Sequence, residues 1–348
     1  MANLAMPKGA RVLVTGSTGS VGSAVTNELL KAGLRVRAIV RNLEKGRCLS
    51  DVFQERYGPD IFEILHAEDL AGSGVLREAM DGCAGVVHMA TDTSLGTSPE
   101  QVITPTVALA RAVLQAAADA PTVRRVVFTS SAATLPRLHE PGHITPASWA
   151  FDDVVRMAWS PTTVEDDDTN TMRALIIYAA SKIEAERACW AFMREGEQPR
   201  SFVLNTVVLM TCLGAFVHPR LVSSMNGLLL GTWRGEAEAG TVVQALGVQC
   251  HVDLEDLGLL HLAALTLEDV KGGRIVALGE EFSYNDVIGV MQRMDPGRKL
   301  PQKAPSVAAA VAATVERGRY KELLARMGKE EPTGLQESIQ KAVASSSP

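Results

Sequence analysis

Short apolar runs alternate with amphipathic stretches along the first 210 residues of the chain. The run at 11–15 precedes a stretch in which Val21, Val25 and Leu29 recur at helical spacing, and Gly33 ends that pattern. Continuous apolar strands separated by helices are typical of a parallel sheet covered on both faces. The pattern predicts strands at residues 11–15, 36–40, 60–65, 85–89, 124–129 and 202–209, and further helices at 102–118 and 175–195.

We therefore predict an α/β fold, a Rossmann-type doubly wound parallel sheet with right-handed crossovers. Residues 132–173, rich in Pro, Trp and Asp, interrupt the last crossover, and the regular alternation ends after residue 210. We expect a dinucleotide-binding domain over 1–210, to which segments near 251–280 return. A smaller, interleaved C-terminal substrate lobe is expected mainly over 211–348, with 132–173 contributing to its pocket.

Three glycines at spacing G-x-x-G-x-x-G lie between the first predicted strand and the first predicted helix. Glycine permits a tight turn and close approach of the backbone to a pyrophosphate, and the helix N-terminus presents free N–H groups to it. This context predicts a dinucleotide site. Its residues are Gly16, Ser17, Thr18, Gly19, Ser20, Val21 and Gly22.

The end of the second predicted strand indicates which nucleotide is bound. An NAD site usually carries an acidic residue there, whereas this chain has Arg41 and no carboxylate until Glu44. Arg41 can pair with a 2′-phosphate in bidentate fashion, and Lys45 adds positive charge. An ordinary surface salt bridge is the alternative. The pattern favours NADPH/NADP+ as cofactor.

Tyr178 and Lys182 are spaced i, i+4, which places them on one face of a predicted helix. A nearby ammonium favours the phenolate of a tyrosine and so makes it a usable proton donor and acceptor. Ser130 and Ser131 end the fifth predicted strand, at the sheet edge where ligands bind, and a hydroxyl there can hydrogen-bond a substrate carbonyl. We expect Tyr178 to protonate the developing alkoxide.

The histidines and cysteines point away from metal chemistry. His139 and His143 match H-E-x-x-H, but Pro141 and Gly142 forbid the helix that this zinc motif needs, so no metal is expected. His88 lies in an apolar strand and is predicted to be a hydrogen-bonded core residue. The five cysteines are scattered, which fits a reducing compartment.

Charge and hydropathy limit the partners. The net charge is −6 and no long run of Lys or Arg occurs, which disfavours nucleic acid and anionic membrane surfaces. No apolar leader precedes the first strand, and no apolar stretch reaches the roughly 20 residues of a membrane span. A cytoplasmic enzyme acting on a small-molecule carbonyl compound is expected.

These motifs together resemble the extended short-chain dehydrogenase/reductase superfamily, and within it the fungal aldehyde and ketone reductases, which are related to plant dihydroflavonol reductases. The similarity spans nearly the whole chain. The stretches that carry it are Thr15 to Gly22, 126–131, 144–149, Tyr178-x-x-x-Lys182 with 181–187, 204–207, 323–329 and 333–338.

The resemblance implies roles for single residues. Ser131 would be the catalytic serine, and Arg41 the residue that discriminates NADPH. Asp69 and Leu70 would lie beside the adenine, and Met89, Ala90 and Thr91 beside the cofactor ribose and phosphates. Leu135, Trp149 and Phe216 would line the substrate wall, with an ordinary core position as the alternative. Together with Phe151 and Trp159, these rings suggest a bulky, partly aromatic carbonyl substrate. A monomer or a homodimer is implied.

One position departs from the family pattern. Relatives carry a Pro after the last strand of this domain, where this chain has Leu209. Three activities therefore stay open: NADPH-dependent reduction of an aldehyde or ketone, an epimerase or dehydratase that uses bound nicotinamide transiently, and a non-catalytic NADP(H) sensor.

Overall fold

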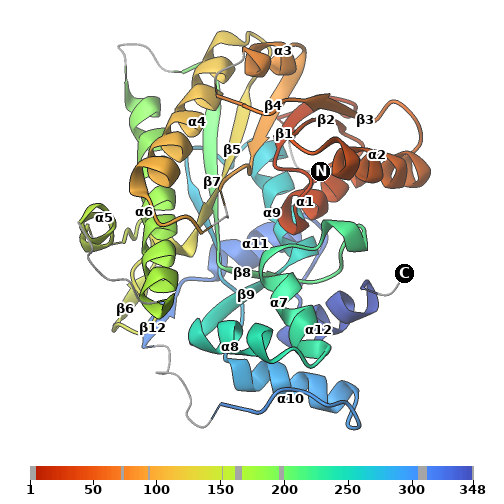
Figure 1. The fold of residues 1–348 in the computed structure, drawn as a ribbon. Helices are drawn as coiled ribbons and strands as arrows, with labels where there is room; N and C mark the ends of the chain where they lie inside the picture. Colours follow the sequence, from red (N-terminus) through yellow and green to blue (C-terminus); the bar gives the residue numbers. More distant parts are fainter. Residues whose placement is uncertain are drawn as a thin grey trace.

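The computed structural model describes residues 5–71, 74–92, 95–150, 152–160, 167–195, 200–304 and 312–346. Its centre is a seven-stranded parallel sheet of order β10-β7-β5-β4-β1-β2-β3 (Figure 1). The strands are β1 (Arg11–Thr15), β2 (Arg35–Val40), β3 (Phe62–His66), β4 (Cys83–His88), β5 (Arg125–Ser131), β7 (Val203–Leu209) and β10 (Arg274–Ala277). The order runs outward from β1 in both directions, which confirms the predicted Rossmann-type fold.

Helices cover both faces of this sheet, and β1 shows why its three central residues are all apolar. Val12 and Val14 pack on one face, whereas Leu13 packs on the other, because successive side chains of a strand point to opposite sides. One face carries α1 (Ser20–Lys31), α2 (Leu43–Tyr57), α9 (Leu254–Thr266) and α11 (Gly318–Arg326). The other carries α3 (Val75–Met80), α4 (Pro99–Asp119) and α6 (Asp167–Arg194).

Two elements differ from the sequence-based prediction. Helix α6 begins at Asp167, well before residue 175, because 167–194 contains neither Gly nor Pro and starts with acidic residues that suit a helix N-terminus. Strand β10 was predicted only as part of a returning segment near 251–280. A segment of four residues is too short for its hydrophobic pattern to predict a strand. It forms one here because it pairs with β7.

The segment between β5 and α6 contains little regular structure. It holds η1 (Ala132–Thr134), β6 (Gly142–Ile144) and α5 (Asp153–Trp159). His139 lies in a turn and His143 in β6, so the H-E-x-x-H stretch is not helical, as its Pro and Gly predict. Strand β6 pairs in parallel with β12 (Ala313–Val315), which ties this segment to the C-terminal part of the chain.

Most of the remaining elements form a smaller lobe at the end of the sheet where β7 continues into β8 (Thr211–Leu213). A three-stranded sheet of order β11-β9-β8 includes β9 (Gln249–Asp253) and β11 (Glu281–Phe282), strands that sequence analysis did not predict. Figure 1 shows the lobe helices grouped below the main sheet. They are α7 (Ser224–Trp233), α8 (Ala237–Ala245), α10 (Tyr284–Met294) and α12 (Leu335–Ala344), with the short η2 (Pro219–Leu221).

Candidate active site

The glycine-rich turn between β1 and α1 has the geometry of a close backbone approach. Gly16 has φ +79°, and a Cβ there would come within 2.8 Å of the Ala90 backbone nitrogen. A Cβ on Gly22 would lie 1.9 Å from the Gly16 carbonyl oxygen. Gly19 is the N-cap of α1 and supplies no side-chain cap. No larger residue fits at 16 or 22, so these glycines allow the tight turn that leads into the N-terminus of α1, as a dinucleotide site requires.

Unpartnered polar atoms at this turn fit a bound dinucleotide. The hydroxyls of Ser17 and Thr91 are buried and have no hydrogen-bond partner. Buried polar groups are rarely left unsatisfied without a functional reason. Next to them, Ser20 N donates to Ser223 Oγ at 3.1 Å, and Ser223 N donates to Ser20 Oγ at 2.8 Å. The smaller lobe therefore contacts the turn directly, a contribution of Ser223 that sequence analysis missed.

The structure brings the predicted cofactor residues to one edge of the sheet. Ala90 and Met89 follow β4, and their N–H groups donate to Thr15 Oγ1 at 3.2 and 3.3 Å. Arg41 and Lys45 are exposed after β2. Asp69 and Leu70 follow β3, where Asp69 Oδ1 accepts a hydrogen bond from Ala71 N and Leu70 packs in the core. All of these groups follow the carboxyl ends of β1 to β4, the side on which such sheets bind ligands.

Tyr178 and Lys182 lie one turn apart on α6, facing the carboxyl end of β5. Lys182 is 4% exposed, and its Nζ donates to the Thr129 carbonyl at 2.9 Å and lies 5.1 Å from the centre of the Phe128 ring. Burial lowers the pKa of Lys182 to about 8, while the negative charge of Glu186 acts in the opposite direction. Burial raises the pKa of Tyr178, and an interaction with the Ser131 side chain opposes that rise.

The two serines that end β5 point in different directions. Ser131 lines a large cavity together with Tyr178, and its Oγ accepts a hydrogen bond from Ala133 N at 3.2 Å. Ser130 is buried, and its Oγ donates to Glu186 Oε2 at 2.5 Å. Neighbouring positions of a strand face opposite sides, so only Ser131 can reach a substrate.

Sequence analysis missed the buried ion pair beneath this site. Glu186 Oε1 accepts from Arg274 Nε at 2.8 Å, and both side chains are at most 5% exposed. Arg274 also donates to Thr134 Oγ1 at 2.7 Å and to the carbonyl of Ser148, and its guanidinium stacks 4.1 Å from the Trp149 ring. The pair therefore holds the segment that follows Ser131 against α6 and β10. The two residues are 88 positions apart in the sequence, so no local pattern could predict that they pair.

A cavity of about 710 Å³ extends from Ser131 and Tyr178 toward the smaller lobe. Leu135, one of the predicted wall residues, lines it. Leu209, Met210 and Thr211 form the side next to β7. The α7 and α8 residues that line the far side were not singled out by the sequence. They are Met225, Leu228, Val242 and Leu246, with Leu246 directly after α8.

Two residues that were predicted for the substrate wall, Trp149 and Phe216, do not line this cavity. Trp149 stacks on Arg274 and borders a separate surface depression, and Phe216 is 7% exposed within the core beside α1. Trp159 is 43% exposed and is not among the residues that line the large cavity. Phe151 lies outside the described residues. Trp149 therefore covers a cation, Phe216 packs in the core and Trp159 lies partly in water, contacts that sequence alone could not locate.

Leu209 remains part of the sheet. It is the last residue of β7 and pairs with Ser131 of β5 and Ala277 of β10. A proline at this position would lack the N–H that a ladder can use. The leucine therefore extends β7 by one paired residue and adds an apolar side chain to the cavity.

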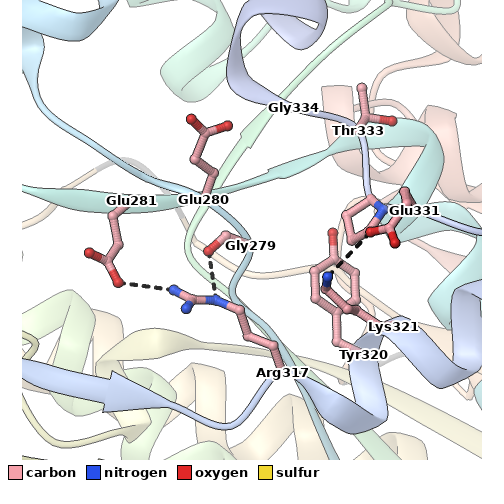
Figure 2. A pocket seen from close by; sticks show the side chains of 10 residues that line it. Gly279, Glu280, Glu281, Arg317, Tyr320, Lys321, Glu331, Thr333 and Gly334 are labelled. Atoms are coloured by element: carbon pink, nitrogen blue, oxygen red, sulfur yellow. Dashed lines mark hydrogen bonds and ion pairs between the residues drawn. The ribbon is translucent and has the colours of Figure 1, made fainter.

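A second cavity, of about 510 Å³, lies between β11, α11 and the segment before α12. Figure 2 shows that its charged groups face one another: Arg317 pairs with Glu281 at 3.0 Å and Lys321 with Glu331 at 3.2 Å. None of the predicted catalytic residues lines it. The remaining carboxylate of the lining, Glu280, accepts a hydrogen bond from Leu335 N at 2.9 Å, so the charged groups of this cavity already have partners within the fold.

Neither a membrane-spanning helix nor a cluster of metal ligands is found within the described part of the chain. No helix there has the length and apolar character needed to cross a membrane. No group of three or more His, Cys, Asp or Glu side chains in those same ranges could hold a metal ion.

Comparison with solved structures supports the fold. The chain is similar to Gre2 from Candida albicans in its complex with NADPH, with a TM-score of 0.78 and 21% identity over 97% of this chain and 98% of that one. It is also similar to vestitone reductase from alfalfa, with a TM-score of 0.70 and 21% identity. At these identities the similarity concerns the fold alone.

Comparison with known sequences identifies the family. The chain is 34% identical over 305 residues to the NAD-dependent epimerase/dehydratase terH of Aspergillus terreus, which covers 87% of each chain. It is 30% identical over 347 residues to aldehyde reductase 2 of Sporidiobolus salmonicolor, covering 99% of this chain and 98% of the relative. A model of the NAD dependent epimerase/dehydratase family matches residues 12–226, which include the glycine-rich turn, Ser131, Tyr178 and Lys182. The chain therefore belongs to the NAD dependent epimerase/dehydratase family of extended short-chain dehydrogenases/reductases, as its motifs predicted.

Proposed function

We propose that this protein reduces an aldehyde or ketone to the alcohol with NADPH. The observation that carries the proposal is that Ser131 and Tyr178 line one end of a large cavity, with the buried Lys182 one turn from Tyr178 on α6. The glycine-rich turn and the unpartnered hydroxyls of Ser17 and Thr91 lie at the same edge of the sheet. Relatives named aldehyde reductase 2 and ketoreductase adrE, at 30% and 31% identity over nearly the full chain, support it.

The chain's own groups would handle the proton and the charge on the substrate oxygen. When bound, NADPH supplies the hydride that adds to the carbonyl carbon. Tyr178 donates its phenolic proton to the oxygen, and Ser131 donates a hydrogen bond to the same atom. The Lys182 ammonium, fixed by the Thr129 carbonyl, stabilises the phenolate that remains.

The preference for NADPH rests on Arg41. Its side chain is exposed after β2, and no hydrogen bond or ion pair of its guanidinium is found within the described ranges. Arg41→Ala should weaken NADPH binding roughly 10- to 100-fold, because a charge-assisted contact to the 2′-phosphate is lost, and should leave NADH binding within about twofold. Equal losses for both cofactors, measured by fluorescence titration, would contradict this assignment.

The decisive test compares the parent protein with Tyr178→Phe. NADPH oxidation is followed with a panel of aldehydes and ketones, and NADPH binding is measured in parallel. We expect turnover to fall by roughly 10²- to 10⁴-fold in the variant, because the proton donor is gone, while NADPH affinity is retained. Turnover that survives in Tyr178→Phe would remove Tyr178 from the mechanism.

The family description also includes epimerases and dehydratases, which are the alternative to a reductase. An epimerase or dehydratase would retain its nicotinamide and would show no net consumption of NADPH. Purified protein that carries tightly bound cofactor and oxidises no added NADPH with any carbonyl compound would favour that rival.

A further inference from the structure

The walls of the large cavity are almost entirely aliphatic. Tyr178 is the only Phe, Tyr or Trp among its described lining residues. Apolar side chains come from the segment after β5, from α6 and from the smaller lobe. They include Leu135, Leu138, Leu175, Leu209, Leu228 and Leu246. Such walls favour an apolar ligand, because each buried CH₂ contributes about 0.8 kcal/mol to transfer from water.

The polar side chains of the lining, apart from Ser131 and Tyr178, already have partners or lie at the rim. Thr211 Oγ1 donates to Gln249 Oε1 at 3.3 Å, and Gln249 Nε2 donates to the Leu246 carbonyl at 2.7 Å. Arg137 pairs with Glu140 at 3.0 Å and with Asp153 at 2.8 Å. His139 is exposed. A sugar or a charged substrate would have to lose water without gaining equivalent hydrogen bonds.

Two large apolar side chains of this cavity are unusually exposed. Leu95 is 46% exposed and Val242 is 43% exposed, and they come from different segments, one before α4 and one in α8. Val242 and Leu246 are one helical turn apart, so they share a face toward the cavity. A ligand that extends from Tyr178 to this face would cover apolar surface that is otherwise in water.

We propose that the substrate is a large, predominantly aliphatic ketone or aldehyde without charge and without several hydroxyl groups. Its carbonyl lies at Ser131 and Tyr178, and its hydrocarbon body extends to Val242 and Leu246. This inference rests on the proposed reductase function. It replaces the partly aromatic substrate expected from Trp149, Trp159 and Phe216, none of which lines the cavity.

The first experiment measures kcat/KM with NADPH for propanal, cyclohexanone, 2-decalone and acetophenone, and binding of the same ketones and of UDP-glucose by calorimetry in the presence of NADP+. We expect kcat/KM to rise roughly fourfold per added methylene, 2-decalone to exceed acetophenone, and UDP-glucose not to bind. Turnover that does not rise with carbon number, or binding of UDP-glucose, would overturn the inference while leaving the reductase in place. Tight binding of 2-decalone without any turnover would support the substrate class and sink the proposed function.

Variants of α8 locate the far end of the substrate. Leu246→Trp and Val242→Trp should lower kcat/KM for 2-decalone at least about tenfold more than for propanal, because the added ring fills the cavity. Gln244→Trp is the matched control, since Gln244 is exposed on the same helix and does not line the cavity. Val242→Trp keeps the test valid if Leu246→Trp fails to fold, because the Val242 side chain is already exposed and a larger side chain there should not disturb the core. Equal effects of all three variants on both substrates would contradict this placement.

Discussion

Burial shifts the pKa values of the two proposed catalytic residues in opposite directions. Lys182 is almost fully enclosed, and removal from water lowers its pKa from 10.5 to about 8. The same physical cause acts in the opposite sense on Tyr178, whose pKa rises because burial penalises the phenolate. In the reductive direction both shifts matter, since Tyr178 must carry a proton and Lys182 must carry a charge.

The pH dependence of reduction should therefore reflect Lys182. Its charged form is present below about pH 8 and is lost as the pH rises through that value, whereas Tyr178 stays protonated over this range. We expect kcat for carbonyl reduction to be level below pH 8 and to fall up to tenfold per unit above it. In Lys182→Arg the charge persists, so this decline should disappear even if the rate is lower. A decline that stays at the same pH in Lys182→Arg would assign it to another group.

At the level of single elements, α6 carries both the proposed catalytic residues and a buried carboxylate that stabilises the fold. Tyr178, Lys182 and Glu186 follow one another at i, i+4 and i+8, so one helical face carries the proposed proton donor, the ammonium and the carboxylate. Glu186 accepts hydrogen bonds from Ser130, Thr206 and Arg274. A rigid helix thus places its reactive groups relative to β5, β7 and β10 together.

Loss of the Glu186 charge should destabilise the protein strongly. Glu186→Gln leaves the Arg274 guanidinium buried without a counter-charge, and the expected loss is about 3–5 kcal/mol in the free energy of unfolding. Glu184→Gln is the control on the same helix, because its pair with Arg187 is exposed and should contribute at most about 0.5 kcal/mol. Urea denaturation measures both.

A double variant separates charge from shape. Glu186→Gln combined with Arg274→Met removes both charges and should recover part of the stability lost in the single variant. If Glu186→Gln alone costs less than about 1 kcal/mol, the pair does not anchor the segment after Ser131.

At the scale of the whole molecule, the buried histidines His88 and His261 make the stability of the fold depend on pH. His88 shares a 2.7 Å hydrogen bond with Thr15 Oγ1, which already accepts from two backbone N–H groups, so the hydroxyl donates to the ring. His261 contacts Thr129 Oγ1 at 2.8 Å and the Leu257 carbonyl at 2.8 Å. Burial lowers the pKa of His88 to about 3 and that of His261 to about 4. The prediction that His88 is a hydrogen-bonded core residue is confirmed.

Acid should therefore unfold this protein through its neutral histidines. Below pH 6.5 the unfolded chain binds protons that the native His88 and His261 do not, so stability falls as the pH falls. Each histidine contributes a slope of up to about 1.4 kcal/mol per pH unit until its native pKa is reached. In His261→Gln the slope of unfolding free energy against pH between 6 and 4 should drop by about the share of one histidine. An unchanged slope would exclude His261 as a source of acid sensitivity.

The sequence by itself determined the features that depend on neighbours along the chain. Strand and helix alternation, the glycine-rich turn and the Tyr178–Lys182 spacing are periodic or local, so hydrophobic pattern and helix geometry are enough to recognise them. The sheet and the meeting of these motifs at its carboxyl edge follow from the handedness of strand–helix–strand units.

Only the tertiary structure decided what depends on distant contacts. The Glu186–Arg274 pair, the opposite orientations of Ser130 and Ser131, and the wall supplied by α8 join residues far apart in sequence. Trp149 was predicted in the substrate wall, but it stacks on Arg274 instead, because an aromatic side chain carries no sequence signal for which of several apolar or cationic surfaces it will cover. The proposed catalytic residues can therefore be recognised from local motifs, whereas the shape and apolar character of the cavity beside them arise only when the smaller lobe packs against the sheet.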